Sequence, residues 1–176
     1  MIRKILSTKN PKMSQVCKKV KVVDKKVISI TKDLKETLTV QKDPEGVGLA
    51  APQIGENLRI FAMKDNGKIR VIINPEILEI SKEKYKKANI KEKEIMEGCL
   101  SLPNYYGPLK RPQKIKIKHL DFDGITKEEE FTNFSAQIVQ HEIDHLNGII
   151  FVNRLLEQKQ PLYKLENDKW QEIELI

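Results

Sequence analysis

The sequence predicts an α+β fold in which antiparallel β-sheets pack around a central α-helix, with an amphipathic helix near the N-terminus. Short apolar segments occur in pairs that are joined by turn residues, which is typical of antiparallel hairpins. The stretch 133–146 has helical periodicity and carries apolar residues on two faces, so we expect sheets to bury it. The stretch 24–42 repeats its apolar residues with the same period. With 176 residues and no repeat or low-complexity linker, a single domain over 1–176 is expected.

The N-terminal helix is predicted over residues 24–42. Asp24 can cap its start, because its side chain can accept a hydrogen bond from a free backbone N–H of the first turn. The Asp43-Pro44 pair should end it, since the residue before a proline disfavours helical geometry. The apolar residues that recur near a period of 3.6 are Val27, Ile30, Leu34 and Leu38.

Two hairpins are predicted in the middle of the chain. Residues 58–64 and 68–80 are rich in branched side chains and flank the turn sequence Asp-Asn-Gly. The segment 114–120 alternates strictly, and an Asp-Gly turn connects it to a strand-like stretch at 126–131. A closing strand is expected at 170–176, and the lysine-rich stretch 81–95 is expected to be an exposed excursion between strands.

The central helix should begin with Thr132 or Asn133 as its cap and end at Asn147-Gly148. One of its faces carries two aromatic or aliphatic side chains and both of the helix's histidines: Phe134, Ile138, His141 and His145. Because the histidines share a face with core residues, we expect them to be shielded from water.

The sequence HEIDH, residues 141–145, places two imidazoles one helical turn apart, so both can direct a nitrogen at one ion. Glu142 lies about 100° around the helix and can reach a water bound to that ion. This HExxH arrangement is found in metallohydrolases. The alternative is a helix that merely contains histidines, but the chain has three histidines and two of them fall here. The third, His119, lies in an alternating strand and is interpreted as an ordinary sheet residue.

The residue types alone leave the third metal ligand open. No histidine follows Gly148, and Glu157 and Glu166 have no supporting pattern. Upstream, Cys99 follows a glycine, and a thiolate is a strong ligand for zinc or ferrous iron. A lone cysteine is also commonly just a small buried apolar residue.

Three segments in chain order, GVGLAAPQ (46–53), EGCLS (97–101) and QHEIDH (140–145), together resemble the signature motifs of the peptide deformylase family. The resemblance extends over most of the chain. It implies that 1–176 is one deformylase-like catalytic domain, a metal-dependent hydrolase that removes the N-formyl group from the initiator methionine of newly synthesised polypeptides and releases formate. The aromatic segment NYYGPLKR (104–111) and the lysine-rich excursion depart from what we expect of the family, which leaves the subclass open.

The resemblance also implies roles for individual residues. Glu142 would be the general base, and the Gln53 side chain and the Leu100 backbone N–H would stabilise the oxyanion. One Fe²⁺ per chain is expected, which Zn²⁺, Ni²⁺ or Co²⁺ can replace. The implied ligands are Cys99, His141 and His145.

The substrate backbone is expected to lie strand-like along the first two motifs. Its implied contacts are Val47, Gly48 and Gly98, with Phe134 and Ile138 as walls of an apolar methionine pocket. Glu97 and Arg111 resemble a charged pair of the family. Asp144 is expected either to orient part of the site without contacting the metal or to lie exposed on the helix.

The net charge of +7 comes mostly from lysines that are interleaved with acids, so solvated faces are the favoured interpretation. We expect N-formylmethionyl nascent peptides as partners and, at most, a transient association with the ribosome. A monomer with no role for DNA is expected. No apolar run approaches the ~18 residues of a membrane-spanning helix, and two cysteines provide no disulfide framework, so a cytoplasmic location is expected.

Two other functions remain open. A zinc endopeptidase would share the HExxH sequence and Glu142, but it needs a wider groove. A basic protein that binds nascent chains or ribosomal RNA, and keeps a structural metal, would need neither Glu142 nor Gln53.

Overall fold

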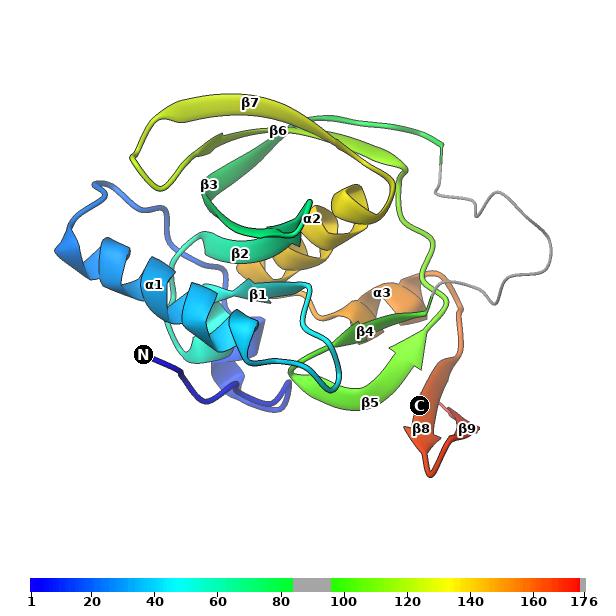
Figure 1. Cartoon of the computed structure of the whole chain (residues 1–176). Helices are drawn as coiled ribbons and strands as arrows, with labels where there is room; N and C mark the ends of the chain where they lie inside the picture. The colour runs from blue at the N-terminus through cyan, green and yellow to red at the C-terminus, as the bar shows by residue number, and fades with distance from the viewer. Residues whose placement is uncertain (84–95, 175–176) are drawn as a thin grey trace.

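Two antiparallel sheets and the helix α2 (Asn133–Leu146) organise the computed structural model, which describes residues 1–83 and 96–174 (Figure 1). The five-stranded sheet has the order β1-β2-β3-β6-β7, and the four-stranded sheet has the order β4-β5-β8-β9. The α+β class is therefore confirmed. The remaining elements are η1 (Pro11–Ser14), α1 (Lys25–Thr39), β1 (Gly48–Ala50), η2 (Ala51–Ile54), β2 (Ile60–Asp65), β3 (Lys68–Ile80), β4 (Glu97–Cys99), β5 (Leu102–Gly107), β6 (Lys114–Leu120), β7 (Thr126–Thr132), α3 (Phe151–Glu157), β8 (Leu162–Glu166) and β9 (Lys169–Ile173).

The helix α2 is buried on nearly all sides, as its two apolar faces predicted. Every residue from 136 to 146 is buried, including both histidines. One apolar face packs on the five-stranded sheet in a cluster that includes Ile117, Val139 and Ile143. Thr132 is the N-cap residue, although its side chain makes no capping hydrogen bond. The helix ends at Leu146 with Asn147 as its C-cap, and Gly148 follows at φ 72°.

The amphipathic helix α1 covers the other face of the same sheet. Asp24 caps it as predicted, with its carboxylate accepting the Val27 N–H at 2.9 Å. The prediction that the helix extends to residue 42 is wrong, because it ends at Thr39. The chain then turns back on itself: the Gly46 N–H donates to the Gln41 carbonyl, and residues 42 and 45 form an antiparallel bridge.

Both predicted hairpins are present, as β2–β3 and β6–β7. The closing strand is β9, which begins at Lys169 and ends at Ile173. Glu174 lies outside the strand, contrary to the prediction of 170–176, and residues 175–176 lie outside the described part. Most of the expected 81–95 excursion, residues 84–95, also lies outside it. His119 is a buried residue of β6, as its interpretation required.

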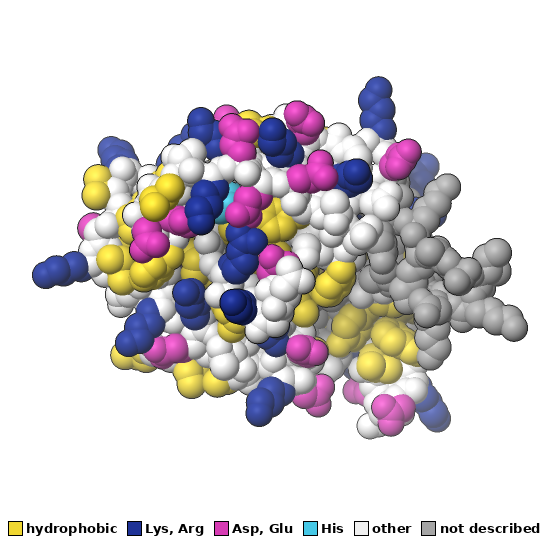
Figure 2. All heavy atoms as spheres, turned by 45° about the horizontal axis from the view of Figure 1, so that its top comes forward, with side chains coloured by type: hydrophobic (Ala, Val, Ile, Leu, Met, Phe, Trp, Pro, Cys, Tyr) yellow, Lys and Arg dark blue, Asp and Glu magenta, His cyan; other side chains and the backbone are white. Residues whose placement is uncertain are grey.

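The surface carries mixed charge. Figure 2 shows Lys and Arg side chains interspersed with Asp and Glu over the face that it displays. Cross-strand pairs such as Lys116 and Glu128, 3.3 Å apart on β6 and β7, contribute to this pattern. Among the described residues, no helix combines the length and the apolar character that a bilayer crossing requires.

Candidate active site

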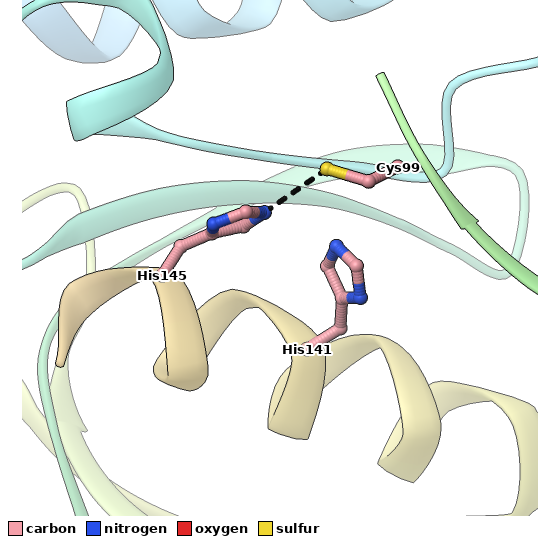
Figure 3. Close-up of side chains that lie close together, drawn as sticks. All are labelled: Cys99, His141 and His145. Atoms are coloured by element: carbon pink, nitrogen blue, oxygen red, sulfur yellow. Dashed lines mark hydrogen bonds between the residues drawn. The ribbon is translucent and has the colours of Figure 1, made fainter. Parts of the chain in front are cut away.

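The helix α2 and the strand β4 bring together three side chains that could hold a metal ion (Figure 3). The two histidines extend from successive turns of α2 toward Cys99 at the end of β4. The donor atoms of all three residues lie within 4.8 Å of one another, and the Cys99 Sγ lies 3.2 Å from the His145 Nε2. Within the described ranges no other trio of such residues gathers in this way, so neither Glu157 nor Glu166 joins the histidines.

The donor set fits one divalent ion of the zinc or ferrous type. A thiolate with two imidazoles leaves a coordination position open, which is the pattern of catalytic rather than structural sites. The Nδ1 of His141 lies 2.7 Å from the Glu97 carboxylate, and donation to it leaves the Nε2 for an ion. Burial holds the pKa of His145 well below its usual value, so this imidazole stays neutral and able to coordinate.

A network of buried charged side chains supports His141 through its Nδ1. Arg111 donates to both oxygens of Glu97, with both N···O distances at 2.7 Å. Burial opposes ionisation of Glu97, but Arg111 and His141 hold its pKa well below the usual range. Arg111 also donates to Asp144 at 2.9 Å, and Arg154 on α3 donates to both oxygens of Asp144. The expected Glu97–Arg111 pair is therefore present, and the alternative that Asp144 is exposed is wrong.

Arg111→Met should destabilise the protein by about 3–5 kcal/mol, because it leaves Glu97 and Asp144 buried without their shared cation. Urea unfolding followed by circular dichroism measures the change. Arg3→Met is the matched control: Arg3 pairs with Asp33 at 2.9 Å but is one-third exposed, so its loss should cost below about 1 kcal/mol. Equal losses of unfolding free energy in the two variants would contradict a special role for the buried charge network.

Glu142 lies against β1 at the same site. Its side chain is buried, and its Oε2 has no hydrogen-bond partner among the described residues. Burial raises the pKa of Glu142 to about 7, which gives this carboxylate proton affinity near neutral pH. The carboxylate fits because residue 48 is a glycine: a Cβ there would lie 2.2 Å from the Glu142 Oε1.

Gly48→Ala should lower kcat/KM by about a hundredfold or more, since an added methyl group must displace the Glu142 carboxylate. Formate release from a formyl-methionyl peptide, the reaction that the motif resemblance implies, is the measurement. Gly67→Ala is the control, because this glycine lies in the β2–β3 turn at φ 76° with nothing near its Cβ. That control should lose some stability and keep its activity; wild-type kinetics in Gly48→Ala would show that the carboxylate tolerates displacement.

The Gln53 amide group points at Cys99. Its Oε1 accepts the Ala50 N–H at 2.7 Å, which fixes the orientation of the amide. Its Nε2 donates to the Ser101 Oγ at 3.1 Å and lies 3.6 Å from the Cys99 Sγ. The amide nitrogen of Gln53 therefore lies on the side of the group that faces Ser101 and Cys99. Ser101 was missed by sequence reasoning, and so was Arg154, because only tertiary contacts give either residue a partner here.

A cavity of about 210 Å³ opens beside these groups. Met96, Tyr105 and Tyr106 also line it, and no sequence pattern predicted them. The structure brings to this one cavity all of the predicted substrate-contacting and catalytic residues together with one of the histidines: Val47, Gly48, Gln53, Gly98, Leu100, Phe134, Ile138, His141 and Glu142.

The family model described as polypeptide deformylase matches residues 2–161. The chain belongs to this family. The peptide deformylase of Pseudothermotoga lettingae is 44% identical over 153 residues, which cover 87% of this chain and 82% of that protein. The peptide deformylase of Dictyoglomus thermophilum is 40% identical over 90% of this chain and 95% of its own length.

Solved deformylases have the same fold. The Thermotoga maritima enzyme superposes with a TM-score of 0.77 at 34% identity, covering 88% of this chain and 97% of that one. The Ehrlichia chaffeensis enzyme, in complex with actinonin, gives 0.78 at 34% identity over 90% and 91% of the two chains. The family match ends at residue 161 of the present chain, so its hairpin β8–β9 lies beyond the matched range.

Proposed function

We propose that this chain is an active peptide deformylase, a metal-dependent hydrolase that removes the N-formyl group from the initiator methionine of new polypeptides and releases formate. The observation that carries the proposal is the meeting of Cys99, His141 and His145 beside the buried carboxylate of Glu142. Membership of the deformylase family supports it. The whole chain, 1–176, is proposed to act as one catalytic domain.

Fe²⁺ is the proposed metal, and Zn²⁺, Ni²⁺ or Co²⁺ can replace it. Cys99, His141 and His145 would hold it, and a mixed thiolate and imidazole set suits these ions. When bound, the ion acidifies a water molecule and polarises the formyl oxygen. The buried position of the ligands keeps other water away from the reacting atoms.

Proton transfer is assigned to Glu142. Its carboxylate takes a proton from the attacking water and later delivers one to the departing amine, for which a pKa near 7 is well matched. Gln53 and the Leu100 N–H are assigned to the oxyanion, because donors that are already oriented stabilise charge that develops in the transition state. The fixed Gln53 amide supports this assignment.

The peptide is proposed to add as a strand between two free sheet edges. In the described residues, β1 pairs only with β2, and β4 pairs only with β5, yet both border the cavity. The Lys64 N–H donates to the Val47 carbonyl, so the alternating antiparallel pattern turns the backbone groups of Gly48 away from β2. Gly48 and Gly98 can then bind substrate backbone, with Phe134 and Ile138 beside the methionine side chain.

The proposed partners are N-formylmethionyl nascent peptides. Action as a monomer is proposed, and the net charge of +7 supports a transient association with the ribosome. The proposed location is the cytoplasm.

Formate release from formyl-Met-Ala-Ser tests the function. The protein should release formate and leave the free tripeptide intact, because its chemistry is directed at the formyl carbon. An acetylated peptide is the matched control and should react far more slowly, if at all. Cleavage of an unblocked peptide without formate release would instead favour the zinc endopeptidase.

Metal analysis of protein purified without oxygen tests the cofactor. Iron near one ion per chain, together with activity that decays in air, would support Fe²⁺. Activity that persists through long exposure to air would favour zinc, nickel or cobalt. Full activity after exhaustive chelation would overturn the metal requirement.

A further inference from the structure

The hairpin β8–β9 contributes an aromatic side chain to the neighbourhood of the substrate cavity, although it lies beyond the family match. Its Trp170 contacts Tyr106 of β5 edge to face, with ring centroids 5.5 Å apart and planes at 77°. Tyr106 lines the cavity. The C-terminal hairpin and the proposed active site are thus joined by one pair of rings.

The strand register explains why these two rings meet. Tyr106 lies opposite Tyr163 of β8, which in turn lies opposite Glu172 of β9. Residues directly opposite each other share a face of the sheet, and residues two apart along a strand do so as well. Trp170 therefore stands on the Tyr106 face of the sheet. The opposite face packs on α3 through Tyr105 and other side chains.

The Tyr106 ring also covers Gly98 on the edge strand β4. The two residues are paired across the strands, and a Cβ on Gly98 would lie 2.6 Å from the Tyr106 Cδ1. Because Gly98 has no side chain, the Tyr106 ring can lie against its backbone. A peptide residue that pairs with Gly98 would direct its side chain to the face on which a Gly98 Cβ would lie, where it would meet the Tyr106 ring.

We propose that Tyr106 is a specificity-determining residue that contacts the first or second side chain after the formylmethionine and favours a large apolar or aromatic one. Trp170 is the positioning residue that holds the ring over Gly98. The inference rests on the proposed deformylase function and deepens it. An aromatic contact of this kind contributes a few-fold to about tenfold in kcat/KM.

Two peptide series test the proposal, formyl-Met-Xaa-Ala and formyl-Met-Ala-Xaa, with Ala, Leu or Phe at Xaa. The wild-type protein should prefer Phe and Leu over Ala in one of the series. Tyr106→Ala should reduce that preference by roughly three- to tenfold, and Tyr106→Phe should keep it because the ring remains. Trp170→Ala should reduce it less, and Trp170→Phe should restore it in part.

Two controls separate specificity from a structural defect. Formyl-methionine amide has no downstream side chain, so its loss of kcat/KM in Tyr106→Ala gives the baseline, and the loss for the preferred Phe or Leu peptide should exceed that baseline by roughly three- to tenfold. Gln171→Ala changes the neighbour of Trp170 on the other face of β9 and should leave the preference intact. A loss in Tyr106→Ala that is equal for all substrates, or an unchanged preference, would overturn the proposal.

Fluorescence gives a second measurement that needs no turnover, because Trp170 is the only tryptophan in the sequence. In Glu142→Gln protein, formyl-Met-Phe-Ala or formyl-Met-Ala-Phe should change the Trp170 emission in a saturable way, and formyl-methionine amide should change it less. Unchanged emission with both tripeptides, when calorimetry reports binding, would count against the proposal. Absence of formate release by the wild type from any substrate would instead remove the deformylase function itself.

Discussion

Glu142→Gln should lower kcat/KM for formyl-methionyl peptides by at least about a hundredfold and leave the metal content at the wild-type level. The amide fills the same volume beside Gly48, so the packing of the site is preserved. It cannot accept the proton that the attacking water must lose. The carboxylate is not among the three side chains whose donor atoms gather, so the ion should remain. Formate release and elemental analysis of the same sample measure both quantities.

Glu166→Gln is the control for this substitution. It also removes one negative charge, but from an exposed side chain on β8 that pairs with Lys164. Its kinetics should match the wild type. Normal turnover in Glu142→Gln would remove this residue from the mechanism, and loss of the metal in that variant would assign it to coordination instead.

Cys99→Ala should weaken metal binding by more than about a hundredfold and abolish formate release. Loss of an outer-shell partner alone weakens metal sites by roughly 10–100-fold, and a ligand contributes more than such a partner. The two imidazoles on α2 would remain, but without the Cys99 sulfur, which lies 3.2 Å from the His145 Nε2. Elemental analysis after dialysis against a chelator measures the retained ion.

Cys17→Ala provides the matched control, because Cys17 is the other cysteine of the chain and is also buried. It packs in the apolar cluster beneath α2, and burial raises the pKa of its thiol to about 11, so it is not a thiolate near neutral pH. This variant should keep its metal and lose only some stability. Full metal occupancy in Cys99→Ala would show that a different residue completes the site.

The long elements could be predicted because each carries a local signal. The apolar period of α1 and the cap at Asp24 determine where that helix begins, and the turn between β2 and β3 determines their pairing. The strands β1 and β4 have three residues each, too few for an alternating pattern to be recognised. The helix α3 was missed because its seven residues are too few for a helical period to be recognised. The end of α1 was misplaced because the backbone turn at Gln41 decides it, and not the proline.

The site residues likewise fall into two groups, those with a local sequence pattern and those whose partners are distant in the sequence. HExxH is a local pattern, so the histidines and Glu142 could be predicted from their spacing on one helix. Cys99 lies 46 positions before His145, and only the family resemblance connected the two. The partners of Arg154 and Ser101 come from other segments of the chain, so their contacts required the fold.

The burial of the side chains at the site has a consequence for timing. Glu142 and His145 are almost completely shielded from solvent, at 3% and 1% exposure, so only the tip of an extended chain could be brought against them. A polypeptide whose first residues had already folded into a domain would present no such tip. If the chain acts as proposed, it therefore competes with the folding of its own substrates, and slow synthesis or delayed folding would lengthen the interval in which it can act.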